Sequence, residues 1–193
     1  RDTRGHGRLT WEQVLIKSSN IGMAIVGQKL GTGRMHDALR RFGFGQKTQC
    51  GLPGESVGKV NPRARWNHYS VTSVPMGHEV AATPIQLVRA FAALANDGLM
   101  AQPRIIFPQS HEATAPIYER VVSSRTAGLT RRALRRAVTS GTGRRADSPL
   151  YEIFGKTGTA QIAAPDGRGY LEDQYVASFI CGAPYEGPRI VVG

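Results

Sequence analysis

The sequence predicts an α+β domain in which helices come first and an antiparallel sheet comes last. Residues 1–150 place apolar side chains mainly at helical spacing, whereas residues 151–193 change to the period of strands. Runs of helices followed by runs of strands favour an α+β layer arrangement, and short connections imply an antiparallel meander. A length of 193 residues with 40% hydrophobic content suits one globular domain with a sizeable core. The predicted strands cover residues 151–163, 174–181 and 188–192.

Capping residues and glycines mark the boundaries of the predicted helices. Thr10 with Gln13, and Thr83 with Gln86, have the spacing of a capping box, and Pro84 occupies the first helical position of the second. Each later helix runs up to a glycine, which is typical of helix C-termini. The predicted helices cover residues 11–17, 21–30, 35–42, 84–97 and 123–138.

A long irregular loop is predicted at about residues 43–66, where glycine and proline are frequent. Loops of this length inside a compact domain tend to be functional or to cover something. Cys50 lies in this loop and Cys181 lies in a predicted strand, and neither has the spacing of a metal-ligand cysteine. Two free thiols are therefore expected.

The formal net charge of +11 favours anionic partners such as nucleic acid, anionic lipid or an anionic polymer. The arginines are dispersed, however, and their one cluster lies at helical spacing opposite Leu134 and Val138, as on the solvated face of an amphipathic helix. Nucleic acid is therefore not expected as a partner. The clustered residues are Arg131, Arg132, Arg135 and Arg136.

Both ends of the sequence look cut, because the chain begins without a methionine and stops inside an apolar run. The expectation is a piece of a longer protein, truncated at both ends. No run of about 18 apolar residues occurs, so no membrane-spanning helix is predicted within the chain.

Lys156 lies among small residues in the segment FGKTGTAQ, on the first predicted strand. A phosphate-binding loop would need glycine in place of Leu150 and a helix starting at the lysine, and the sequence supports neither. In a strand, Thr157 and Thr159 share one face, and Gly158 allows a ligand to lie close to the backbone. The hydroxyls could then hold a carboxylate in the positive field of Lys156. The alternative is an ordinary edge strand with a protective lysine.

A second polar signal is Ser18-Ser19-Asn20, which interrupts two helical segments. Small polar residues compete with the helix for backbone hydrogen bonds. One interpretation is a simple N-cap, with Ser19 or Asn20 starting the second helix. The other is a hydroxyl and an amide presented into a cleft from the junction.

Ser18–Asn20 and Lys156–Gly158, in this order, match the Ser-x-Asn and Lys-Thr-Gly signatures of penicillin-binding proteins and class A β-lactamases. The blocks LTWEQVLIKSSNIG, FGFGQKTQCGLPGE, TPIQLVRAFAALANDG, GTGRRA and FGKTGTAQ resemble the transpeptidase domain of a class B penicillin-binding protein over nearly the whole chain. β-Lactamases are a poorer match because they lack the LPGE loop and the TPIQL helix. The resemblance implies a penicillin-binding/β-lactamase-like serine acyltransferase fold. Residues 1–193 would be part of that domain, with residues 151–193 carrying Lys-Thr-Gly.

The resemblance implies a peptidoglycan D,D-transpeptidase that cross-links wall stem peptides through a serine acyl-enzyme and binds β-lactams. It implies no metal and no cofactor. The implied partners are the D-Ala-D-Ala stem peptide and other wall-synthesis or division proteins, at the bacterial inner membrane with the domain facing the periplasm. The resemblance also implies a role for each motif residue. Ser18 would relay a proton, Asn20 would bind the lysine of the nucleophile motif and a substrate amide, and Lys156 would tune this network electrostatically. Thr157 and Thr159, on either side of Gly158, would bind the terminal carboxylate, and the Thr159 N–H would contact the oxyanion.

The Ser-x-x-Lys nucleophile motif of this family should precede Ser18, and no serine stands there. The nucleophile is therefore expected outside this chain, and the chain alone is expected to be inactive. A formal match, Ser56 to Lys59, falls in the predicted loop and not at a helix N-terminus, so it is interpreted as fortuitous. His78-Glu79 begins a zinc-protease motif, but Ala82 stands where the second histidine would be. The alternative function is a non-catalytic module that binds wall peptides or a partner protein.

Overall fold

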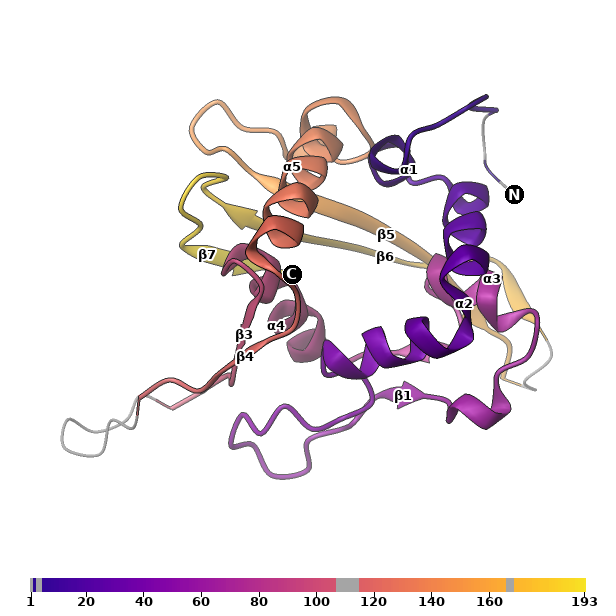
Figure 1. The fold of residues 1–193 in the computed structure, drawn as a ribbon, viewed down its shortest axis with the longest axis horizontal. Helices are drawn as coiled ribbons and strands as arrows, with labels where there is room; N and C mark the ends of the chain where they lie inside the picture. The colour runs from indigo at the N-terminus through magenta and orange to yellow at the C-terminus, as the bar shows by residue number, and fades with distance from the viewer. Residues whose placement is uncertain (1, 3–4, 107–114, 166–168) are drawn as a thin grey trace.

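The computed structural model describes residue 2 and residues 5–106, 115–165 and 169–193 (Figure 1). These residues form α-helices, short 3₁₀ helices and three separate antiparallel sheets. The helices are α1 (Trp11–Lys17), α2 (Asn20–Arg41), α3 (Ser70–Ser73), α4 (Pro84–Ala95) and α5 (Ser124–Ser140). The strands are β1 (Lys59–Val60), β2 (Val80–Ala81), β3 (Leu99–Ala101), β4 (Tyr118–Arg120), β5 (Phe154–Ala163), β6 (Tyr170–Ala183) and β7 (Ile190–Val192).

The largest sheet has the order β5-β6-β7 and is antiparallel throughout, which confirms the predicted meander. Lys156 pairs with Ile180 and Gly158 pairs with Ser178 across β5 and β6. Within the described part of the chain, β5 pairs on one side only, so its other edge carries free backbone donors and acceptors.

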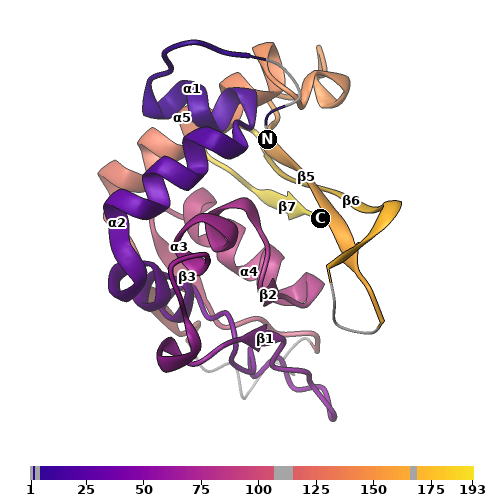
Figure 2. The ribbon, with the colours of Figure 1, turned by 90° about the vertical axis from the view of Figure 1, so that its right-hand side faces the viewer.

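The main core lies between this sheet and two helices. Phe154 of β5 is fully buried and its ring stacks on Phe91 of α4 at a centroid distance of 5.6 Å, while Leu134 of α5 packs beside it. A Cβ at Gly182, the cross-strand partner of Phe154, would lie 2.5 Å from the Phe154 ring. Figure 2 shows the helices on one side of the sheet, so the predicted α+β layering is confirmed. Burial of one phenylalanine contributes about 2–3 kcal/mol.

Both predicted capping boxes are present, at Thr10 with Gln13 and at Thr83 with Gln86. The label α2 covers two helices that meet at a kink at Gly31, whose backbone is not helical (φ 78°, ψ 164°). The predicted break at this glycine is therefore confirmed, although no loop separates the two helices. Positive φ is readily available only to glycine, which explains the kink at this residue.

The described residues up to 150 also contain four strands that the sequence did not predict. β1 pairs with β2, and β3 pairs with β4, each in an antiparallel two-stranded ladder. These strands are two or three residues long. Alternation cannot be detected over so few residues, so the strand period gives no signal there. The predicted loop at 43–66 accordingly contains β1.

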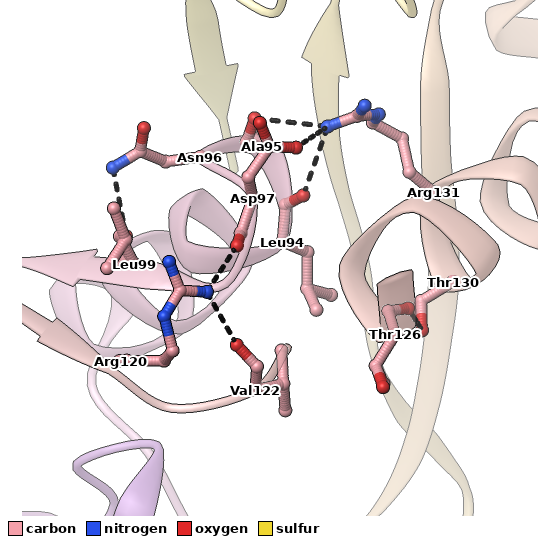
Figure 3. A network of polar contacts seen from close by, with 10 residues as sticks. All are labelled: Leu94, Ala95, Asn96, Asp97, Leu99, Arg120, Val122, Thr126, Thr130 and Arg131. Carbon is pink, nitrogen blue, oxygen red and sulfur yellow. Dashed lines mark hydrogen bonds and ion pairs between the residues drawn. The ribbon is translucent and has the colours of Figure 1, made fainter. Parts of the chain in front are cut away.

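The predicted solvated face of α5 is wrong for Arg131, because this side chain closes the C-terminal end of α4 (Figure 3). Its Nη1 donates to the carbonyl oxygens of Leu94 and Ala95 and lies 3.3 Å from Asp97 Oδ1. Carbonyls in the last turn of a helix have no intrahelical partner, so an arginine donor from a neighbouring helix satisfies them. Arg120 binds the Asp97 carbonyl from the other side.

Arg135 also faces inward, with Nη1 2.8 Å from Asp147 Oδ1 and 3.0 Å from the Ile153 carbonyl oxygen. Arg132 and Arg136 are exposed, but both pair with Glu12 of α1. The arginine cluster therefore ties α5 to its neighbours. Helical periodicity placed these side chains on the polar face but could not show that other elements cover it.

Gln86 fastens the loop at 43–66 to α4. Its side chain is 1% exposed, and Nε2 donates to the carbonyl oxygens of Gln46 (2.7 Å) and Val57 (2.9 Å). Its Oε1 accepts from Thr83 N at 2.9 Å. One buried side-chain amide thus binds the loop at two positions, Gln46 and Val57. Cys50, within this loop, and Cys181 are both free thiols, as predicted.

Replacing Gln86 with methionine is expected to lower the free energy of unfolding by roughly 3 kcal/mol, because it leaves two carbonyls and one N–H unpaired in a buried place. Denaturant unfolding followed by circular dichroism measures this loss. Gln13→Met is the matched control, since Gln13 completes the other capping box at an exposed position. Equal losses in the two variants would contradict a special role for Gln86.

Candidate active site

Ser18 and Ser19 adopt different roles at the junction of α1 and α2. Ser19 is the N-cap of α2, is 3% exposed, and its Oγ accepts from Gly22 N at 3.0 Å. Ser18 is exposed and adopts the left-handed conformation (φ 54°, ψ 45°). This left-handed residue is the C-cap of α1, and its N–H donates to the Leu15 carbonyl oxygen at 3.2 Å. The capping interpretation therefore applies to Ser19, and the cleft interpretation applies to Ser18.

Lys156 joins this junction to the sheet. Its Nζ donates to Ser18 Oγ at 2.8 Å and to the Thr157 carbonyl oxygen at 2.8 Å. Burial lowers the pKa of Lys156 below its ordinary value, because desolvation disfavours the charged ammonium. The result is a partly desolvated amine in contact with a hydroxyl, an arrangement suited to proton transfer.

A cavity of about 600 Å³ lies along the free edge of β5 and the start of α2. Four of the predicted site residues line it: Ser18, Asn20, Thr157 and Thr159. Gly158 lies between the two threonines, where a Cβ would come within 2.5 Å of Ser178 Oγ on β6. A side chain at this position would therefore require the Ser178 hydroxyl to rotate. The other lining residues are Asp2, His6, Lys17, His78, Thr142, Gln161 and Tyr175.

Thr142 is a site residue that motif reasoning did not single out. Its Oγ1 lies 2.7 Å from Thr157 Oγ1, so the two hydroxyls orient each other at the cavity wall. Thr142 follows α5 in the GTGRRA block. That block contributed to the family resemblance, but neither its composition nor its spacing indicates contact with β5.

The two motifs interpreted as fortuitous lack the geometry of their chemistry. Ser56 lies in the loop, where its Oγ accepts from Gly58 N, and Lys59 begins β1, so the pair does not share a helical turn. Glu79 accepts hydroxyl hydrogen bonds from Ser70 and Ser73. In the described part of the chain, no group of three or more histidine, cysteine, aspartate or glutamate side chains could hold a metal. His78 instead borders the cavity.

The arrangement can bind an extended chain that ends in a carboxylate. The free edge of β5 offers backbone groups for strand addition, Thr157 and Thr159 line the cavity, and Lys156 Nζ donates to the Thr157 carbonyl oxygen. Among the described helices, none has both the length and the apolar character to cross a bilayer.

The family model "Penicillin binding protein transpeptidase domain" matches residues 1–193. The sequence is 38% identical to penicillin-binding protein PbpB of Mycobacterium tuberculosis, over 100% of this chain and 30% of that protein. It is 32% identical to the probable peptidoglycan D,D-transpeptidase PenA of Neisseria gonorrhoeae, over 100% of this chain and 32% of that protein. The chain thus spans about a third of the length of these relatives.

A solved structure is also similar over almost the whole chain. The crystal structure of penicillin-binding protein 3 from Mycobacterium tuberculosis, complexed with aztreonam, superposes with a TM-score of 0.88 at 38% identity. The match covers 98% of this chain and 46% of that one. A TM-score this high supports the same arrangement of helices and sheet in both.

Proposed function

The chain belongs to the penicillin-binding protein transpeptidase family, and from this premise we propose that it forms part of a peptidoglycan D,D-transpeptidase. The observation that carries the proposal is the hydrogen bond from Lys156 Nζ to Ser18 Oγ, at 2.8 Å, beside a cavity with two threonine hydroxyls. A nucleophile serine from outside these residues would complete the site.

The reaction would proceed by acyl transfer. The serine hydroxyl attacks the carbonyl between the two terminal D-alanines, an ester to the serine forms, and the amide bond to the last D-alanine breaks. Ser18 relays a proton to the departing amine, and Lys156 tunes this relay through its hydrogen bond. The amine of a second stem peptide then attacks the ester, which releases the serine and forms the cross-link.

Substrate binding would use β5. The stem peptide adds to the free edge of the strand, Thr157 and Thr159 bind its terminal carboxylate, and Asn20 holds a peptide amide and the lysine of the nucleophile motif. The backbone N–H of Thr159 would be one oxyanion donor, and the loss of one such donor typically costs about 10²–10³ in rate.

β-Lactams would acylate the same serine, which fits the relative solved with aztreonam. We place the whole protein at the bacterial inner membrane, with this domain facing the periplasm and other wall-synthesis or division proteins as partners. Both assignments rest on family membership.

Intact mass spectrometry of the full-length protein with and without penicillin tests the proposal. A single adduct is expected, at a serine outside residues 1–193, and Ser56→Ala should retain it. An adduct at Ser56 would identify a different nucleophile. Absence of any adduct would favour a non-catalytic module that binds wall peptides or a partner protein.

A further inference from the structure

Asp2 binds the junction that carries Ser18 and Asn20. Its Oδ2 accepts from Ser19 Oγ at 2.6 Å, and its Oδ1 accepts from Ile21 N at 3.1 Å. The two contacts bracket Asn20, and Asp2 itself borders the cavity. Asp2, which precedes α1 in the sequence, thus contacts the first turn of α2.

The contacts satisfy groups for which the described residues offer no other acceptor. The first N–H groups of a helix lack intrahelical acceptors, and a carboxylate at that end is favoured by the helix dipole. Ser19 Oγ already accepts from Gly22 N, so its own hydrogen needs a separate acceptor, which Asp2 supplies. One carboxylate therefore fixes both the cap side chain and the backbone that follows it.

The backbone of the junction is closed locally, because Ser18 N donates to the Leu15 carbonyl oxygen and Ser19 N donates to the Val14 carbonyl oxygen at the end of α1. Two contacts from elsewhere in the chain then place this turn: Lys156 binds Ser18 Oγ, and Asp2 binds Ser19 and Ile21. Neither contact alone fixes both the peptide direction and the hydroxyl of Ser18.

We propose that Asp2 is a positioning residue for Ser18: its carboxylate holds the Ser18–Asn20 turn so that Ser18 Oγ meets Lys156 Nζ. The proposal deepens the transpeptidase assignment and rests on it for the catalytic meaning of the turn. Burial raises the pKa of Asp2, but hydrogen bonds from the Ser19 hydroxyl and the N–H groups of Ile21 and Asn20 outweigh this and lower it. The carboxylate is thus ionised at neutral pH and accepts at both oxygens.

Asp2→Asn in the full-length protein tests the inference. The amide NH₂ would face one of two donors, so one contact is lost. The rate constant of penicillin acylation should fall by about 10- to 100-fold, as expected for a misplaced catalytic group. The dissociation constant of the initial complex should stay within about threefold, since Thr157 and Thr159 are untouched.

Ser123→Ala is the matched control, because Ser123 caps α5 through the same kind of bond, to Thr126 N. It should lower the melting temperature to a similar extent and leave the acylation rate unchanged. Equal acylation rates in wild type and Asp2→Asn would overturn the proposal.

Crystal structures of wild type and Asp2→Asn separate this proposal from the assigned function. If the wild type fails to react with penicillin, the transpeptidase assignment fails, but the structures still decide the role of Asp2. The expected result is a shifted Ser18–Asn20 turn in which Ser18 Oγ lies beyond hydrogen-bond distance of Lys156 Nζ. A variant in which Ser18 Oγ stays at Lys156 Nζ would overturn the inference.

Discussion

Replacement of Lys156 with methionine is expected to lower the rate of β-lactam acylation of the full-length protein by about 10³-fold. The change removes the ammonium that donates to Ser18 Oγ and the positive charge beside Thr157. Methionine keeps much of the side-chain volume, so β5 should keep its packing. The rate constant is measured with a fluorescent penicillin under single-turnover conditions.

Lys59→Met is the control, because Lys59 is exposed on β1 and belongs to the loop motif interpreted as fortuitous. Its acylation rate should equal that of the wild type. A loss in Lys59→Met that matches the loss in Lys156→Met would point to Ser56–Lys59 as the working motif.

The same Lys156 variant should differ from wild type in the pH dependence of stability. Burial lowers the pKa of Lys156, so the folded protein releases this proton at a lower pH than the unfolded chain, in which the pKa of lysine is about 10.4. Between the two pKa values the unfolded state binds more protons, and wild-type stability therefore gains as pH rises through that window. Below it, the full cost of the buried charge is present. Thermal unfolding in this alkaline range should show that contribution in wild type and lack it in Lys156→Met.

Local chemistry allowed the helix boundaries to be predicted. Thr10 with Gln13, and Thr83 with Gln86, accept hydrogen bonds from backbone N–H groups within one helical turn. Both partners of each bond are therefore close in the sequence, and the motif can be recognised without the structure. The kink at Gly31 is local in the same sense, because only one residue needs positive φ. β5 and β6 are long enough for the strand period to be visible, whereas β7 has three residues and was recognised by its apolar β-branched residues after the turn at residues 183–188.

Contacts between distant segments could not be derived in this way. Ser18 and Lys156 are 138 residues apart, and only the family resemblance brought them together before the structure did. The family resemblance did not indicate any contact for Arg131 or Asp2. A cationic side chain on the polar face of a helix, or a single carboxylate outside any predicted helix or strand, has the same local pattern whether it is solvated or bonded. Its partner is decided by how other elements pack.

The carboxylate-binding role proposed for Thr157 and Thr159 predicts a selective loss of substrate recognition. In the double variant Thr157→Val/Thr159→Val, acylation by a peptide that ends in a free D-alanine carboxylate should fall by about 10³-fold. A hydrogen bond to a charged group contributes about 1.5–3 kcal/mol, which is roughly 10- to 100-fold for each hydroxyl. Valine suits a strand as well as threonine does, so β5 should remain paired with β6.

The decisive comparison is with the same peptide capped as an amide. Wild type should be acylated much faster by the peptide with the free carboxylate, whereas the double variant should be acylated by the two peptides at nearly equal rates. The reason is that the threonine hydroxyls stabilise the charged carboxylate and not the neutral amide. Thr139→Val removes an exposed hydroxyl from α5 and should keep the wild-type preference. If the double variant lost activity equally on both peptides, the threonines would act on the reacting centre or on the sheet, and the carboxylate would have to be bound elsewhere. If the double variant still preferred the free carboxylate over the amide, the carboxylate would likewise have to be bound by other residues.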